Sequence, residues 1–523
     1  MSSEPDAANN PTNSARSSRL RSRLTPALGK AVRAVARLRG GGSALPGKVV
    51  ESFDPKFMSR TLSQLPLGVL LVSGTNGKTT TTRMIAKTLE NLGLKVFTNP
   101  TGSNFTRGVV SALIPLVDSK GRVDADIAVL ELDEAYAVHF VRQIAPRYAV
   151  LLNVMRDQLD RFGEIDTTAR LLSNVAKATT GTLVLNREDR RIAALAQQTG
   201  AASVRYFGLA ANLRSSFPTD DELHGEAPSD SEDSVGSADF TVPAASASAT
   251  ARTATSTADD LATPTAPAPT PAPSAVVPPN SSPEDLDIAL AVAAAAAENP
   301  LPADVTLCGV HPHSAEFLVG TGAAAQKYSS ELKVSGIYNL FNAAAAISVI
   351  RAVIAEASAT HPELAQTTTE ELLAALSSVT PAFGRGETID VEGTEVELVL
   401  VKNPAGFRLA LTSFSASDAD TMIAINDEYA DGRDMSWLWD VDFASLRAKG
   451  VAMVSGVRSW DMALRLGYDE VNVAKVESGL PAAVDEFVHL NPGVHKRIYC
   501  TYTAMLDIRR HLGELTTVAD VGV

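Results

Sequence analysis

Hydrophobic and polar positions alternate along the chain in blocks that predict strands followed by helices. The apolar run at 68–72 is followed by a loop of small residues and by helical periodicity over 79–89. Further apolar runs at 127–130 and 148–152 each follow a helical or polar connection. Strands that alternate with helices favour a parallel, doubly wound sheet.

A second unit of the same kind is predicted towards the C-terminus. The alanine-rich stretch 339–355 predicts a helix that closes the first unit. After it, apolar strands at 396–401, 422–425 and 451–454 again alternate with helices. The expected fold class is therefore α/β, with a large, mostly parallel doubly wound sheet followed by a second, smaller α/β C-terminal domain.

Composition divides the chain further. A segment at about 213–300 is rich in Pro, Ala, Ser and Thr, and such a segment buries too little apolar surface to offset its ordering entropy. We expect it to be a disordered insertion without chemistry. The predicted divisions are a basic N-terminal arm at 1–45, a central domain at 46–382 that contains the insertion, and a C-terminal domain at 383–523.

Charge and cysteine content exclude several classes of protein. The 523 residues carry a formal net charge of -14, which gives no electrostatic reason to bind nucleic acid. Cys308 and Cys500 are the only cysteines, too few for a disulfide framework or a four-cysteine zinc site. We therefore expect a cytoplasmic protein with no zinc and no nucleic-acid partner.

The N-terminal arm is basic although the protein as a whole is acidic. Its first forty residues hold eight lysines and arginines. Weak attraction to the inner face of the cell membrane is one interpretation, and a solvated tail is the other. Apolar positions recur at helical spacing from Leu24 onward, so part of the arm is expected to pack as a helix on the body.

One loop carries the strongest chemical signal. It follows an apolar strand and opens a helix, the context in which glycine amides, a helix N-terminus and a lysine surround phosphates. A chance glycine turn is the alternative. In the phosphate interpretation Lys78 contacts the β and γ phosphates of ATP, and the Thr79 hydroxyl binds Mg²⁺. The loop reads Ser73, Gly74, Thr75, Asn76, Gly77, Lys78, Thr79, Thr80.

The loop is similar to that of the Mur ligase and folylpolyglutamate synthase superfamily, and three further segments resemble the same superfamily. The acidic cluster at 131–134 implies a magnesium site with Glu131 as the preferred ligand. The segment 336–345 implies that Asn339 and Asn342 approach the adenine of ATP. The segment 384–387 implies that Arg385 reaches the ATP phosphates, with an unpaired exposed arginine as the alternative.

Two C-terminal segments, 402–407 and 426–443, are very similar to the MurT family. That family uses ATP to activate the D-glutamate α-carboxylate of the lipid II stem peptide, while a separate GatD-type glutaminase subunit supplies ammonia to the heterodimer. The resemblance implies that Asp434 orients the catalytic histidine of that partner. A carboxylate that only caps Ser436 or pairs with Arg433 is the alternative, and Asp427 and Asp431 are the next candidates.

The chain departs from these families at three points. Gln158 stands where the motif resembled by 153–163 has a histidine, which weakens any case for a second metal. Val399 replaces the interdomain aspartate of other Mur ligases. The two cysteines also rule out the four-cysteine zinc ribbon of many MurT proteins.

Two other functions stay open from the sequence. A stand-alone Mur-type ligase that adds an amino acid is one, although only about forty-five residues precede the core. An ATP-binding scaffold that completes a glutaminase is the other. The resemblance favours the amidating ligase subunit, with ATP, Mg²⁺ and lipid II as its cofactors and substrate.

Overall fold

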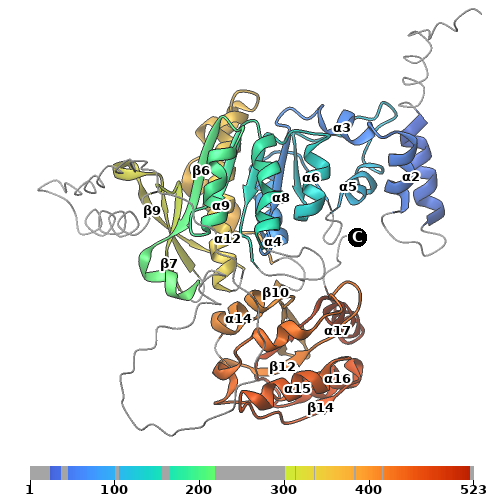
Figure 1. The fold of residues 1–523 in the computed structure, drawn as a ribbon, viewed down its shortest axis with the longest axis vertical. Helices are drawn as coiled ribbons and strands as arrows, with labels where there is room; N and C mark the ends of the chain where they lie inside the picture. Colours follow the sequence, from blue (N-terminus) through green and yellow to red (C-terminus); the bar gives the residue numbers. More distant parts are fainter. Residues whose placement is uncertain are drawn as a thin grey trace, which may run out of the picture.

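The chain folds into two α/β domains, one above the other in the view of Figure 1. The structure is a computed structural model, which describes residues 24–36, 45–99, 105–155, 165–217, 301–311, 314–334, 336–381, 385–414 and 416–518. Most of the insertion predicted at 213–300 lies outside these residues. The described chain before it ends at Phe217, which packs against Tyr338 and Phe341.

The central domain is built on a nine-stranded sheet. The first seven strands in spatial order run parallel, and the last two pair antiparallel at one edge. In spatial order they are β2 (Val96–Thr98), β3 (Ile127–Glu131), β1 (Val69–Ser73), β4 (Tyr148–Leu151), β5 (Thr182–Asn186), β6 (Ser203–Leu209), β7 (Val305–Val310), β8 (Ser314–Val319) and β9 (Gln326–Glu331).

Helices cover both faces of this sheet, because successive side chains of a buried strand point to opposite faces. Leu70 and Val72 of β1 pack in one core with α4, α12 and α13, while Val69 and Leu71 pack in the other with α3, α5, α6 and α8. These helices are α3 (Phe57–Leu62), α4 (Lys78–Asn91), α5 (Thr106–Leu113), α6 (Glu134–Val141), α8 (Ile165–Ala178), α12 (Ile337–Ala357) and α13 (Thr369–Ser377).

Helix α12 is long and apolar enough to pass for a membrane span by composition. Most of it is buried in the core, however, where it packs against α4 and against β5, β6 and β7. Its alanines let the helix lie close to the sheet, since Ala343 to Ala346 are all fully buried. The helix predicted at 339–355 is thus confirmed as a core helix.

The C-terminal domain has a six-stranded sheet in the order β10 (Arg385–Val391), β11 (Thr394–Leu400), β15 (Lys496–Cys500), β12 (Asp420–Ala424), β13 (Met453–Ser455) and β14 (Val476–Glu477). Only the β10–β11 pair is antiparallel among these strands. Its helices are α14 (Pro404–Ser413), α15 (Ser459–Tyr468), α16 (Leu480–His489) and α17 (Tyr502–Leu515). The predicted fold class, a mostly parallel sheet followed by a smaller α/β domain, is confirmed.

The end of the N-terminal arm packs on the central domain as a helix over residues 24–36. Thr25 donates a hydrogen bond to Asp54 (2.9 Å), and Lys30 Nζ donates one to the carbonyl of Val117 (2.9 Å). The helix and these contacts confirm that part of the basic arm packs on the body as a helix. Another helix, α2 (Leu45–Phe53), follows and packs against α5.

Candidate nucleotide and ligase site

The phosphate loop connects β1 to α4 at the carboxyl edge of the central sheet. Gly74 and Gly77 have φ angles of 133° and 86°, which residues with a Cβ rarely adopt. A Cβ on Gly77 would also lie 2.6 Å from the side-chain oxygen of Asn342. Gly77 is therefore required both by the turn and by the closely packed asparagine, and it directs the N-terminus of α4 at the loop.

Asn153, which follows β4, holds the loop in shape. Its side-chain oxygen accepts a hydrogen bond from the amide of Asn76 (2.8 Å), and its side-chain amide donates to the carbonyl of Asn76 (3.1 Å). The Thr75 amide donates to the carbonyl of Asn153 (3.0 Å). The motif at 153–163 begins with Asn153 but predicts no role for it, although a polar residue at the carboxyl end of a buried strand is a usable signal.

Lys78 is buried among oxygen atoms at the start of α4. Its Nζ donates to the carbonyls of Gly74 (2.6 Å) and Thr75 (3.3 Å). The same nitrogen lies 3.2 Å from Asp133 Oδ1 and 3.6 Å from Glu134 Oε1. A buried ammonium needs such partners, and an incoming phosphate group could replace some of them.

The two predicted magnesium ligands are in contact. Thr79 Oγ1 donates to Glu131 Oε1 at 2.8 Å, and both side chains are buried. Asn99, at the end of β2, fixes Glu131 through two hydrogen bonds with its backbone (2.9 and 3.0 Å). The hydroxyl and carboxylate thus arrive together from the N-terminus of α4 and the carboxyl end of β3.

This pair of oxygen ligands fits Mg²⁺. The ion is usually held by one or two protein oxygens, with phosphate and water completing its octahedron. No cluster of three or more metal-ligating side chains forms within the described part of the chain. A site that depends on nucleotide phosphates needs no such cluster.

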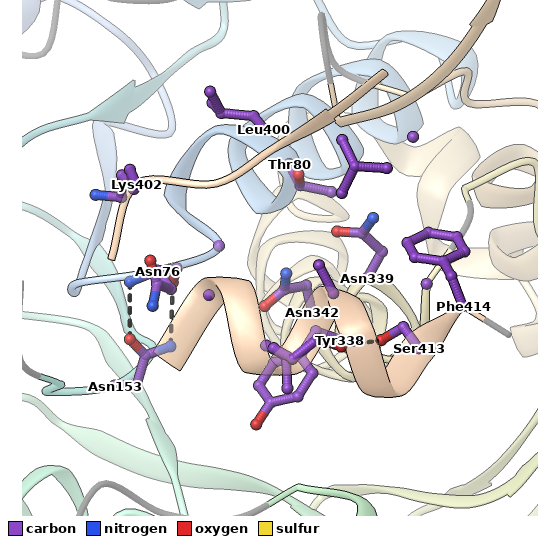
Figure 2. Close-up of a pocket in the computed structure, with 17 residues that line it drawn as sticks. Asn76, Thr80, Asn153, Tyr338, Asn339, Asn342, Leu400, Lys402, Ser413 and Phe414 are labelled. Carbon is purple, nitrogen blue, oxygen red and sulfur yellow. Dashed lines mark hydrogen bonds between the residues drawn. The ribbon is translucent and has the colours of Figure 1, made fainter. Parts of the chain in front are cut away.

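A cleft of about 790 Å³, open solvent included, lies between the two domains beside the loop. Figure 2 shows Asn76 and Thr80 on one side of it, with Asn339, Asn342 and Tyr338 of α12 close by. Phe414 and Leu400 are among the residues of the C-terminal domain that line it. The asparagines expected near adenine therefore share a cleft with the phosphate loop, and the apolar and aromatic lining suits a base.

The C-terminal domain touches the phosphate loop directly. Asn403 exchanges side-chain hydrogen bonds with Asn76 (3.2 and 3.5 Å), and Lys402 Nζ donates to the carbonyl of Thr75 (3.2 Å). Asn403 also caps α14 by accepting from Gly406 (2.7 Å), with Pro404 at the first helical position. The sequence pattern Asn-Pro predicts such a cap, but nothing in it reveals the contact with the loop.

Several predicted residues cannot be placed at the site. Residues 156–164, including Gln158, lie outside the described residues, as does the side chain of Arg385 at the start of β10. Glu387, two residues on, pairs with Arg509 of α17 (2.8 Å). The roles of Arg385 and of the 153–163 motif therefore stay predictions.

Asp434 lies on a surface loop of the C-terminal domain. It is exposed, and its Oδ1 accepts the Ser436 amide (2.9 Å). Hydrogen bonds from Ser436 lower the pKa of the Asp434 carboxyl. The local cap foreseen as an alternative thus exists, yet the exposed carboxylate remains available to another chain. Trp437 in the same loop is buried, as expected for a packing residue.

The other two candidate aspartates are held by hydrogen bonds to other parts of this chain. Asp431 is buried and accepts from the Thr503 amide (2.8 Å), and burial raises the pKa of its carboxyl. Asp427 accepts from Arg458 Nε (2.9 Å). Asp434 is therefore the best placed of the three to reach outward.

Comparison with known proteins agrees with this geometry. A family model described as the Mur ligase middle domain matches residues 72–235, and one described as the MurT ligase C-terminal domain matches residues 400–505. Among solved structures, MurF from Acinetobacter baumannii superimposes with a TM-score of 0.55 at 16% identity, covering 89% of this chain and 80% of that one. MurF from Thermotoga maritima in complex with ADP gives 0.55 at 14% identity, with 90% and 85% covered.

The fold, the phosphate loop and the two family models define an ATP-dependent ligase of the Mur type. Within that class, the chain is similar along most of its length to the MurT subunit of lipid II isoglutaminyl synthase. The Streptococcus pneumoniae protein is 27% identical over 484 residues, which are 90% of this chain and 93% of that one. The Staphylococcus aureus (strain COL) protein is 25% identical over 460 residues, 85% and 86% of the two chains.

Proposed function

We propose that this chain amidates the D-glutamate α-carboxylate of the lipid II stem peptide to D-isoglutamine in peptidoglycan synthesis, using ATP. The observation that carries the proposal is the set of Lys78, Thr79 and Glu131 beside an interdomain cleft that contains Asn339 and Asn342. The printed names of the MurT relatives supply the substrate. A stand-alone amino-acid ligase is disfavoured because Val399 occupies the position of the usual interdomain aspartate.

The proposed reaction has two steps. A glutamate carboxylate oxygen attacks the γ-phosphorus of ATP, ADP leaves, and an acyl phosphate forms. The ammonia nitrogen then attacks the acyl carbon and phosphate leaves. Lys78 stabilises the charge that develops on the transferred phosphoryl group, and the amides at the N-terminus of α4 face the same group.

The protein's other contribution is to position the nucleotide. Asn153 holds the loop open, and Asn403 and Lys402 bring the C-terminal domain against it. Such preorganised positioning supplies most of the catalysis in phosphoryl transfer. Mg²⁺, when bound by Thr79 and Glu131, would neutralise phosphate charge.

We propose that ammonia comes from another chain. Burial raises the pKa of the Cys500 thiol, which disfavours its nucleophilic thiolate. Cys308 lies in β7 with its sulfur against the carbonyl of Glu316 (3.4 Å), not in a strand-to-helix turn. The relatives are named glutamine-hydrolyzing and subunits, so we propose a GatD-type glutaminase as the partner in a heterodimer.

Helix α15 offers a surface for this partner. Trp460, Leu464 and Tyr468 recur at helical spacing on α15, and Val457 lies just before the helix. All four are 58% to 70% exposed. Apolar faces of this kind mark protein contacts. The face is continuous with the Asp434 loop, because Trp439 packs on Tyr468 with ring centroids 5.1 Å apart and Arg458 pairs with Asp427. One partner could therefore cover the face and reach Asp434.

We further propose that the complex works in the cytoplasm, at the inner face of the membrane. A lipid-linked substrate is held at that surface, and the basic arm would be attracted to anionic lipids there.

Lys78→Ala tests the ligase assignment. The change removes a charge from the phosphate site, and we expect ATP-dependent amidation to fall by at least about a hundredfold. Lys87→Ala is the matched control, since Lys87 lies on the same helix but is exposed and pairs with Glu90 at the surface. Full activity of the Lys78 variant would contradict the assignment.

Trp460→Ser tests the docking face. We expect the variant to lose co-purification with the glutaminase while its own thermal unfolding stays unchanged, because Trp460 is 70% exposed. Leu116→Ser, on the central domain and 56% exposed, should leave association intact. Equal association of both variants would place the partner elsewhere.

A further inference from the structure

A second cavity lies on the central domain, away from the nucleotide cleft. Helices α2, α5 and α6 enclose it, and Figure 1 shows the three side by side. Its volume is about 1440 Å³, open solvent included. We call it the α2–α5–α6 groove.

The walls of this groove are fixed to each other. The Gly47 amide of α2 donates to Ser111 Oγ of α5 (2.8 Å). A Cβ on Gly47 would lie 2.1 Å from the carbonyl oxygen of Arg107, so the two helices approach as closely as a glycine permits. Such contacts hold the side chains of the two helices at a constant separation, as a preformed binding site requires.

The groove concentrates positive charge on an acidic protein. Lys48 of α2, Arg107 of α5 and Arg142, which directly follows α6, all line it. Glu51 is the one carboxylate among its lining residues, and it already pairs with Arg107 (3.0 Å). The chain as a whole has a net charge of -14. Converging cations from separate elements indicate an anionic ligand.

The groove also presents aromatic surface. Phe105 and Tyr136 lie with ring centroids 5.8 Å apart at the first turns of α5 and α6. Thr106 lines the groove, is only 7% exposed, and its hydroxyl has no hydrogen-bond partner among the described residues. Because buried hydroxyls are normally paired, this one marks a position where a polar partner is missing.

The position of the groove connects it to the ligase site. Glu134, in the first turn of α6, lies 3.6 Å from Lys78 Nζ. Tyr136 follows two residues later on a different side of the helix, a rise of about 3 Å. The two sites therefore begin at the same turn of α6. The peptide of a ligand held in the groove would have to pass this turn to reach Lys78, and extended peptide covers about 3.3 to 3.6 Å per residue.

We propose that the α2–α5–α6 groove binds the diphosphate and sugar of lipid II and leaves the stem glutamate at the phosphate loop. This inference rests on the proposed function and names the residues that select its substrate. Lys48 and Arg142 bind the diphosphate, and the Phe105 and Tyr136 rings pack against the sugar. The uncharged polyprenyl chain stays in the membrane.

The test uses the full chain co-expressed with its glutaminase, with lipid II in detergent. For the double variant Lys48→Ala, Arg142→Ala we expect the KM for lipid II to rise at least about tenfold, as expected for lost charge-assisted bonds. The kcat and the KM for ATP should stay within about twofold. The control is Lys177→Ala, an exposed lysine of the same domain at the end of α8.

Direct binding separates this inference from the proposed function. Wild-type protein without ATP should bind lipid II more tightly than the double variant, whether or not it catalyses amidation. Amidation by the wild type with an unchanged KM in the double variant would overturn the groove alone. A double variant that also binds phosphatidylglycerol vesicles without lipid II more weakly than the wild type, by the same factor, is a further possible result. That result would overturn the inference as well, because the groove would then be a membrane contact.

Discussion

At the scale of single residues, the site is built from buried polar side chains, each of which has a polar or charged partner. Lys78 is surrounded by two carbonyls and two carboxylates, and Thr79 and Glu131 hold each other. The sequence predicted these residues from their types and order, since glycine, lysine and threonine at a strand-to-helix turn suit a phosphate. It gave no role to Lys402 or Asn403, because their contacts with the loop span about three hundred residues and leave no local pattern.

Asp434→Asn tests the residue that faces outward. Hydrogen bonds from Ser436 lower the pKa of Asp434, so the carboxylate stays ionised at and above pH 5 and its titration should not appear in the activity profile there. If Asp434 orients the partner's histidine, the Asn variant should lower glutaminase activity about 10³- to 10⁴-fold.

ATP binding and complex formation should be unchanged in that variant, because Asp434 is exposed and bonds only Ser436 within the described structure. Asp440→Asn, another exposed carboxylate of the same loop region, is the control. Undiminished glutamine hydrolysis by the Asp434 variant would leave Asp434 with only its local cap.

At the scale of elements, the sequence predicted several of the buried parallel strands and α12, but not the buried strands β5 and β15. Continuous apolar runs bounded by turns identify β1, β3, β4, β12 and α12, because both faces of these elements are covered. The edge strands were missed. β9 reads Gln-Lys-Tyr-Ser-Ser-Glu and has little apolar pattern, and β14 has only two residues. Such edges depend on their neighbours for pairing rather than on their own side chains.

Asp420 and Lys496 tie two neighbouring strands of the C-terminal sheet. They are paired in register on β12 and β15, with the ammonium 2.7 Å from the carboxylate and both side chains buried. Burial by itself would raise the pKa of Asp420, but hydrogen bonds from Lys496 and Asn491 outweigh it and lower the pKa. Asp420→Asn should destabilise the protein by about 3 kcal/mol, because it leaves a buried ammonium without its counter-charge.

The pH dependence follows from the direction of this shift. A carboxyl whose pKa is lower in the folded protein stabilises it fully above the unfolded pKa, about 3.9. That stabilisation is lost as the pH falls through the folded value. Thermal unfolding should therefore show the wild type well above Asp420→Asn between pH 5 and 8, and the gap should shrink below about pH 4. Glu486→Gln, which breaks an exposed pair with Lys475, should change stability little, and an equal effect of both would refute the argument.

At the scale of the whole molecule, function depends on surfaces that the sequence could not locate. The sequence motifs identified both domains, but the cleft between them and the α2–α5–α6 groove arise only when distant segments meet. The α15 face is local in sequence, and the structure was needed to show that it is exposed. The groove is lined by residues in and beside three helices. Its positive charge could not be predicted from a chain whose net charge is strongly negative. Fold class and candidate phosphate site were therefore predictable, whereas the proposed substrate and partner surfaces needed the structure.

The arrangement is consistent with the proposed division of the reaction between two chains. The described part of this chain offers a phosphate site and an exposed carboxylate, and its two cysteines are poor nucleophile candidates. Phosphoryl transfer and glutamine hydrolysis would then proceed on different subunits, joined at the C-terminal domain.

The most direct test is amidation of lipid II with ATP and glutamine, read by mass spectrometry, for this chain with and without a co-expressed GatD-type glutaminase. The account predicts isoglutaminyl lipid II only when both chains and ATP are present. Ligation of an amino acid by this chain alone, or no ATP-dependent product from the complex, would contradict it.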